Sequence, residues 1–75
     1  MRIKKSELYS YLLRVKPYYY SSSIAVIKEN EYIVYSYDTL ILVYNIENDC
    51  VTYFNDKYYS RTTSHLQNII KNIFM

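Results

Sequence analysis

The chain has 75 residues, a formal net charge of +2 and twelve Tyr, but no Trp, no Gly and only one Cys, Cys50. A single Cys excludes an intrachain disulfide, and one Cys with one His cannot supply the four ligands of a structural zinc site, so we expect neither metal nor cofactor. The length predicts one domain, residues 1–75, which buries only about 60% of its unfolded surface. Because such a domain is marginally stable alone, we expect either a partner subunit or unusually apolar packing to supply stability.

The sequence has neither a recognisable leader nor a membrane segment. Residues 1–6 are basic, but the apolar region of a signal peptide does not follow them. The longest nearly apolar run, residues 40–44, is far shorter than the roughly 20 residues of a membrane helix. We therefore expect an intracellular protein that is not secreted and does not bind membranes.

Charge is segregated along the chain. Residues 1–16 contain five basic residues and one acidic residue, residues 24–56 contain one basic and six acidic residues, and residues 57–75 contain three basic residues and no acidic one. Two interpretations remain open: the charges lie on solvated helix faces and in acidic turns, or the two basic ends meet to form one basic face.

The first predicted helix spans residues 6–16, with Ser6 as its N-cap. Pro17 ends it, because a residue that precedes proline avoids the helical conformation. Its apolar residues recur at helical spacing: Leu8, Leu12 and Val15. Residues 17–23, one Pro followed by three Tyr and three Ser, are predicted to connect this helix to a sheet. They form either a simple tether or a patch of Tyr for a partner or for bases.

The centre of the chain predicts a sheet, since β-branched and Tyr residues alternate with turn signals. The predicted strands are residues 23–28, 32–37, 40–44, 50–54 and 57–60. The turns between them are too short for parallel crossovers, so the strands form an antiparallel meander. Residues 40–44 do not alternate between apolar and polar, which predicts a central strand that is covered on both faces.

A second helix is predicted over residues 64–74, with Thr63 or Ser64 as its N-cap. Its apolar residues form a continuous stripe: Leu66, Ile69, Ile70, Ile73 and Phe74. Two amphipathic helices need an apolar sheet face to cover. The predicted fold is therefore α+β, a five-stranded antiparallel β-sheet flanked by an N-terminal and a C-terminal α-helix.

Catalytic motifs are absent from the sequence. Without Gly there is no P-loop, no dinucleotide-binding fingerprint and no nucleophile elbow. A hydrolase with His65 as base and Ser60, Ser64 or Cys50 as nucleophile remains an alternative. Three carboxylates that could act as acids or bases all fall in predicted turns: Asp38, Asp49 and Asp56. We expect no enzyme activity and assign no catalytic residue.

The start of the second helix is a candidate anion-binding or nucleic-acid-binding site, because free backbone N–H groups and the helix dipole attract anions there. The candidate residues are Lys57, Arg61, Thr62, Thr63 and His65. Capping of the helix by Thr63 or Ser64 explains part of this pattern without a ligand.

Tyr residues form a second candidate surface, because Tyr suits both interfaces and the stacking of bases. The residues that we expect to contact a partner are Tyr18, Tyr19, Tyr20, Tyr35 and Tyr37. The surface fits a homodimer, a complex with another protein or a single-stranded nucleic acid.

Two segments of the sequence, SYDTLI at residues 36–41 and YSRTTSHLQN at residues 59–68, resemble a family of small uncharacterised viral proteins. Members of this family come from phages and from filamentous or rod-shaped viruses of hyperthermophilic archaea. The resemblance covers residues 36–74, and its second motif is the more specific one. Leu66 stands where the family has His, and His65 stands one residue earlier, so no role of the family His is transferred. The resemblance implies a viral protein in the host cytoplasm and no assigned reaction.

These observations predict a non-enzymatic viral interaction protein that acts as a homodimer and binds a host or viral protein. The alternative is a regulator that binds DNA or RNA through basic residues and stacked Tyr rings.

Overall fold

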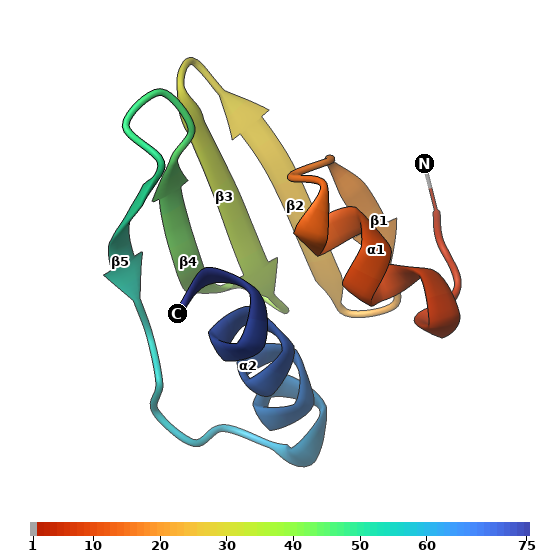
Figure 1. Cartoon of the computed structure of the whole chain (residues 1–75). Coiled ribbons are helices and arrows are strands. Elements are labelled where there is room, and N and C mark those ends of the chain that lie inside the picture. Colours follow the sequence, from red (N-terminus) through yellow and green to blue (C-terminus); the bar gives the residue numbers. More distant parts are fainter. Residues whose placement is uncertain (1) are drawn as a thin grey trace.

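The computed structural model describes residues 2–75 and confirms the predicted α+β fold, a five-stranded antiparallel sheet with a helix on each side of it in the sequence (Figure 1). The helical elements are the 3-10 helix η1 (Lys5–Glu7) and the α-helices α1 (Leu8–Leu13) and α2 (Arg61–Phe74). The strands are β1 (Tyr18–Tyr20), β2 (Ser23–Lys28), β3 (Glu31–Ser36), β4 (Thr39–Asn45) and β5 (Cys50–Phe54).

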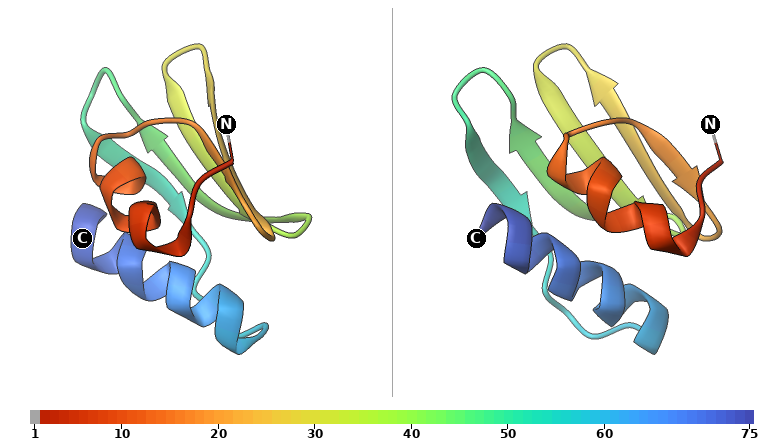
Figure 2. Two further views of the ribbon diagram at one scale, coloured as in Figure 1. Left: turned by 90° about the vertical axis from the view of Figure 1, so that its right-hand side faces the viewer. Right: turned by 45° about the vertical axis from the view of Figure 1, so that its right-hand side comes forward.

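The sheet is a meander in which the strands follow one another in the order β1-β2-β3-β4-β5, so β3 is central. Both α-helices lie on the same face of this sheet, α1 over β1 and β2 and α2 nearer β4 and β5 (Figures 1 and 2). The core lies between the helices and this face. Its buried apolar residues are Ile3, Leu8, Leu12, Tyr18, Ala25, Tyr32, Val34, Ile41, Leu42, Leu66 and Ile70. Within residues 2–75, no helix lies over the opposite face of the sheet (Figure 2).

The first helix is shorter than predicted. It begins with η1, whose N-cap is Lys4 rather than Ser6, and the Glu7 carboxylate accepts a hydrogen bond from the Lys4 backbone N–H at 2.9 Å. The α-helix ends at Leu13 because Val15 adopts a left-handed conformation with a φ of 55°. The chain therefore leaves the helix before Pro17 can end it.

One predicted strand is wrong and one strand was missed. Tyr18–Tyr20, predicted as part of a connector, form β1 and pair with β2. Residues 57–60, predicted as the fifth strand, belong to an extended segment without strand pairing that leads to α2. The Gln67 amide of α2 donates hydrogen bonds to the carbonyls of Asn55 (2.8 Å) and Lys57 (2.9 Å). These carbonyls are thus satisfied by a helix side chain instead of a neighbouring strand.

The prediction that residues 40–44 form the central strand is also wrong, because this segment is part of β4, one strand from the edge. Its continuous apolar pattern comes from an irregularity in pairing between β3 and β4. Val34 pairs with Leu42, whereas the next residue, Tyr35, pairs with Leu40, so Ile41 is an extra residue. Such a bulge lets two consecutive residues, Ile41 and Leu42, both be fully buried.

The chain makes its turns without glycine. The three two-residue turns of the meander each place a positive φ at their first residue: Ser21 (46°), Glu29 (57°) and Tyr37 (55°). A positive φ at this position alone is the pattern of a type II′ turn, in which Gly is preferred. The turns therefore carry local strain that the pairing of the flanking strands holds in place.

Candidate functional site

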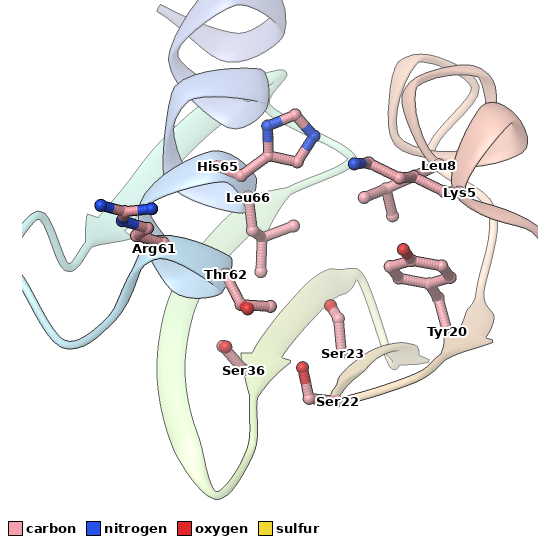
Figure 3. A pocket seen from close by; sticks show the side chains of 10 residues that line it. All are labelled: Lys5, Leu8, Tyr20, Ser22, Ser23, Ser36, Arg61, Thr62, His65 and Leu66. Carbon is pink, nitrogen blue, oxygen red and sulfur yellow. The ribbon is translucent and has the colours of Figure 1, made fainter.

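A cavity of about 330 Å³ opens between the start of α2, the η1–α1 segment and the turn between β1 and β2 (Figure 3). Its basic residues are Lys5, Arg61 and His65. Its hydroxyl residues are Tyr20, Ser22, Ser23, Ser36 and Thr62, and its apolar residues are Leu8 and Leu66. Residues from both ends of the chain and from the sheet thus meet at one concave site.

The position of the cavity depends on how α2 begins. The helix starts at Arg61, three residues before the predicted start, and its N-cap is Ser60 rather than Thr63 or Ser64. The Ser60 hydroxyl accepts a hydrogen bond from the Thr63 backbone N–H at 3.2 Å. The Thr63 hydroxyl is buried and lies 2.8 Å from that of Ser36, at the end of β3. This contact joins the first turn of α2 to the sheet, and of its two residues Ser36 lines the cavity.

The basic residues of the cavity come from opposite ends of the sequence. Lys5 belongs to η1, whereas Arg61 and His65 belong to α2. In Figure 3 the Lys5 and His65 side chains extend toward each other. The Arg61 guanidinium lies farther away, on the side of Thr62 that is remote from Lys5. No carboxylate lines the cavity, and within residues 2–75 none forms an ion pair with these three side chains. The interpretation in which the two basic ends meet is therefore supported at this site.

The hydroxyl groups of the cavity differ in their availability. Ser23 donates to the Tyr35 carbonyl (3.0 Å) and lies 2.8 Å from the Tyr18 hydroxyl, so its hydrogen-bonding capacity is used inside the fold. The Ser36 hydroxyl is likewise hydrogen-bonded within the fold, to the Thr63 hydroxyl. The hydroxyls of Tyr20, Ser22 and Thr62 make no hydrogen bond within the described part of the chain. These three groups can therefore bind a polar ligand.

Only some of the predicted anion-binding residues line this cavity. Arg61, Thr62 and His65 line the cavity, whereas Thr63 is buried and holds the helix in place. Lys57 is exposed in the segment before α2 and does not line the cavity. Sequence reasoning missed Lys5 as a member of this site. The segregation of basic residues to both ends of the chain was the only signal for it.

The face of the sheet without helices forms a second candidate surface. Strand register places eight apolar residues on it: Tyr19, Ile24, Val26, Ile33, Tyr35, Leu40, Val43 and Tyr53. We call these residues the open face. Tyr19 (51%), Tyr53 (44%), Ile24 (39%) and Val26 (39%) retain large exposed fractions. Large apolar side chains on a sheet are normally covered by a second layer.

The predicted Tyr interface is also divided. Tyr19 and Tyr35 belong to the open face, and Tyr37 is exposed in the turn between β3 and β4. Tyr20 lines the cavity. Tyr18 is only 3% exposed, because it packs in the core and bonds to Ser23, so a partner cannot reach it in this structure. Burial raises the pKa of the Tyr18 hydroxyl to about 12.

The residues of the alternative hydrolase do not all come together. His65 lines the cavity described above, whereas Cys50 lines a second, smaller cavity of about 240 Å³ beside the C-terminal end of α2. Ser60 is engaged as the helix cap. Within residues 2–75, no group of three His, Cys, Asp or Glu residues could hold a metal ion. None of the helices in this part of the chain is long and apolar enough to cross a membrane.

Comparison of the chain with protein-family models, curated proteins and solved structures found no match.

Proposed function

We propose that the chain is a non-enzymatic interaction protein that forms a homodimer through the open face. The observation that supports this proposal is the placement of eight apolar side chains on a face that no helix of residues 2–75 covers. Exposed apolar patches of this kind mark interaction sites in soluble proteins. Covering the face would also supply stability that a domain of 75 residues has difficulty obtaining alone.

The open face suits a second copy of the same chain. Its eight apolar residues are uncharged, and the charged residues that register places on the same side, Arg2, Lys28 and Glu31, lie at its margins. The centre of the face therefore offers no charge pattern that would select a partner of opposite charge. Two apolar sheet faces pack about 10 Å apart with interdigitating side chains, as in a β-sandwich. In a two-fold dimer the central strand β3 of one copy would lie over β3 of the other, with Ile33 and Tyr35 near the axis.

The size of the face sets the expected affinity. Strands lie about 4.8 Å apart and rise about 3.3 Å per residue, so the sheet presents a face of about 20 Å by 20 Å, or roughly 400 Å² in projection. This is roughly half of what each partner buries in an interface of standard size. We therefore expect a reversible dimer with a dissociation constant of about 1 to 100 µM.

Sedimentation velocity between about 1 µM and about 500 µM tests this proposal, since this range brackets the expected dissociation constant. A shift from monomer to dimer with rising concentration would support it. A monomer throughout this range would contradict it, and a larger open-ended series of species would exclude a closed two-fold dimer.

Binding of DNA or RNA is a less favoured function for the same face. Stacked bases need basic residues that follow the backbone. In residues 2–75 the register places only two basic residues on this side of the sheet: Lys28, which is paired with Glu31, and Arg2, which is bridged to Tyr19 at one edge. A salt titration separates the two functions, because each phosphate contact steepens the dependence on salt by about 0.7 to 0.9. Lack of binding at about 50 mM salt would exclude the nucleic-acid function. A host or viral protein as an additional partner stays a hypothesis that rests on the sequence resemblance.

A further inference from the structure

We propose that the cavity at the start of α2 binds a small phosphate monoester. Lys5, Arg61 and His65 would contact the phosphate, and Tyr20, Leu8 and Leu66 would contact the compact organic group that carries it. The inference rests on a partly open cavity lined by basic side chains from two distant elements, and not on the helix terminus alone.

The charges of the cavity favour a dianion. Lys5 and Arg61 are both cationic at neutral pH, and the cavity lining contains no carboxylate that would compensate them. A phosphate monoester carries a charge of about −1.5 to −2 at neutral pH, whereas a carboxylate carries only one negative charge. The exposed Arg61 guanidinium extends to one side of the opening, and a change of rotamer, which is fast for an exposed side chain, would bring it over the cavity.

The polar groups of the cavity fit phosphate oxygens. The hydroxyls of Tyr20, Ser22 and Thr62 have no hydrogen-bond partner in residues 2–75 and can each donate to an oxygen. Ser23 and Ser36 are occupied within the fold and form a rigid floor beneath them. A site that combines free donors with a fixed floor orients a ligand with little reorganisation beyond the change of the Arg61 rotamer.

The size and the apolar wall define the organic part. A volume of about 330 Å³ lies at the lower end of the range of small-molecule sites. It holds a compact group such as a sugar or a single nucleoside, and it is too small for a polymer chain. The Tyr20 ring and the buried Leu8 and Leu66 provide an apolar surface on one side for this group.

This site is independent of the proposed dimer. The cavity lies on the side of the sheet that carries the helices, whereas the dimer would use the opposite face (Figure 2). A dimer would therefore present two such cavities, each facing away from the shared interface.

Nuclear magnetic resonance of ¹⁵N-labelled full-length protein tests the proposal with adenosine monophosphate, adenosine and inorganic phosphate as probes. We expect the monophosphate to saturate shifts of the backbone amides of Ser22, Thr62 and His65, with weaker binding of inorganic phosphate and no saturable binding of adenosine. Lys5→Gln should weaken the binding of the monophosphate about tenfold, since it removes a charged hydrogen bond. Lys4→Gln changes the net charge equally, but Lys4 does not line the cavity, so its affinity should stay within about twofold.

Several results would overturn the proposal. The absence of shifts at these amides up to about 10 mM monophosphate would exclude a site of useful affinity. Equal binding of adenosine would show that the phosphate is not recognised, and equal binding of inorganic phosphate would remove the role of the organic group. An equal loss in Lys4→Gln and Lys5→Gln would indicate diffuse attraction instead of a site. The dispersion of the same spectra reports whether each variant is folded.

Discussion

The hydroxyl oxygens of Ser36 and Thr63 lie 2.8 Å apart, and both side chains are buried although they are 27 residues apart in the sequence. Ser36 is the last residue of β3, and Thr63 lies in the first turn of α2. Their contact fixes the start of α2 against the end of the central strand, and it thereby positions Arg61, Thr62 and His65 around the cavity.

Removing either hydroxyl should destabilise the fold. We expect Thr63→Val to lower the free energy of unfolding by about 1 to 3 kcal/mol, because the buried Ser36 hydroxyl loses its partner. Ser36→Ala should cost less, because the Thr63 hydroxyl still accepts a hydrogen bond from the Ser60 hydroxyl at 3.3 Å. The double variant should lose less than the sum of the two. Urea unfolding of the wild type, the two single variants and the double variant measures the coupling energy between the two hydroxyls. If the losses in the free energy of unfolding are strictly additive, the two hydroxyls do not interact. Thr62→Val, at an exposed neighbour, serves as the control and should change stability by less than about 0.5 kcal/mol.

The observed start of α2 can be separated from the predicted one by two alanine variants. Ser60→Ala should lower the free energy of unfolding by about 1 kcal/mol, because it removes the acceptor for the Thr63 N–H. Ser64→Ala should have little effect, since Ser64 lies inside the helix and is not its cap. Thermal unfolding of both variants provides the comparison, and a larger loss for Ser64→Ala would place the cap where the sequence predicted it.

The Gln67 side chain should control the mobility of the segment before α2. In Gln67→Met the carbonyls of Asn55 and Lys57 lose their donor, so this segment should open more often. We expect faster tryptic cleavage after Lys57 and a free energy of unfolding lower by about 1 to 3 kcal/mol. Asn68→Met, at an exposed position of the same helix, should leave the cleavage rate unchanged. Equal rates in wild type and Gln67→Met would show that the amide does not hold the segment.

Stability should fall at alkaline pH because of two buried tyrosines. Burial raises the pKa of Tyr18 from 10.0 to about 12, and burial also raises the pKa of Tyr32. Between pH 10 and 12 the unfolded chain loses these protons while the folded chain keeps them, so the free energy of unfolding should fall by about 1.4 kcal/mol per pH unit for each Tyr. This stabilisation is fully present below pH 10. Urea unfolding on both sides of pH 10 measures the slope, which Tyr18→Phe should roughly halve; a flat profile would contradict the assignment.

A charge on the open face should abolish dimerisation without unfolding the chain. Val26→Lys places an ammonium group on that face, where a second copy would have to desolvate it. The dissociation constant of the dimer should therefore rise at least tenfold. Leu13→Lys makes a similar change at another exposed apolar residue, on α1, and should leave the dissociation constant unchanged. Sedimentation velocity of both variants provides the measurement. Unchanged association of Val26→Lys would show that copies meet through another surface.

The fold class followed from local patterns that depend on neighbouring residues alone. The apolar stripe of α2 and the alternation in β2 and β3 reflect which side of each element is buried, and this is encoded in the spacing of residues. The prediction was wrong where a distant contact decides the structure. Residues 57–60 have strand-like composition, but the Gln67 amide takes the place of a strand. Tyr18–Tyr20 form a strand because β2 is available to pair with them.

The candidate site was predicted only in part for the same reason. Arg61, Thr62 and His65 are close in sequence, so the start of a helix could be recognised as a place where they gather. Lys5 joins them only through the way α1 and α2 pack on one face of the sheet, and nothing in residues 1–16 encodes that packing locally. Tyr18 was predicted to contact a partner, but it packs in the core. Whether a Tyr on a strand faces the core or the solvent depends on the register of β1 with β2, which the local sequence does not reveal.

The pairing at the start of the chain limits how far assembly through the sheet can proceed. The Ile3 N–H donates to the Tyr19 carbonyl at 2.8 Å, and Arg2 forms a parallel bridge with Tyr19, so one edge of the sheet is already occupied. In residues 2–75, β5 pairs with β4 alone, and the other edge stays open. A fibre that grows by strand addition needs an open edge at both sides of the sheet in every copy. The partial cover of the β1 edge by residues 2 and 3 therefore leaves β5 as the edge better suited to strand addition, and growth through both edges becomes less favourable.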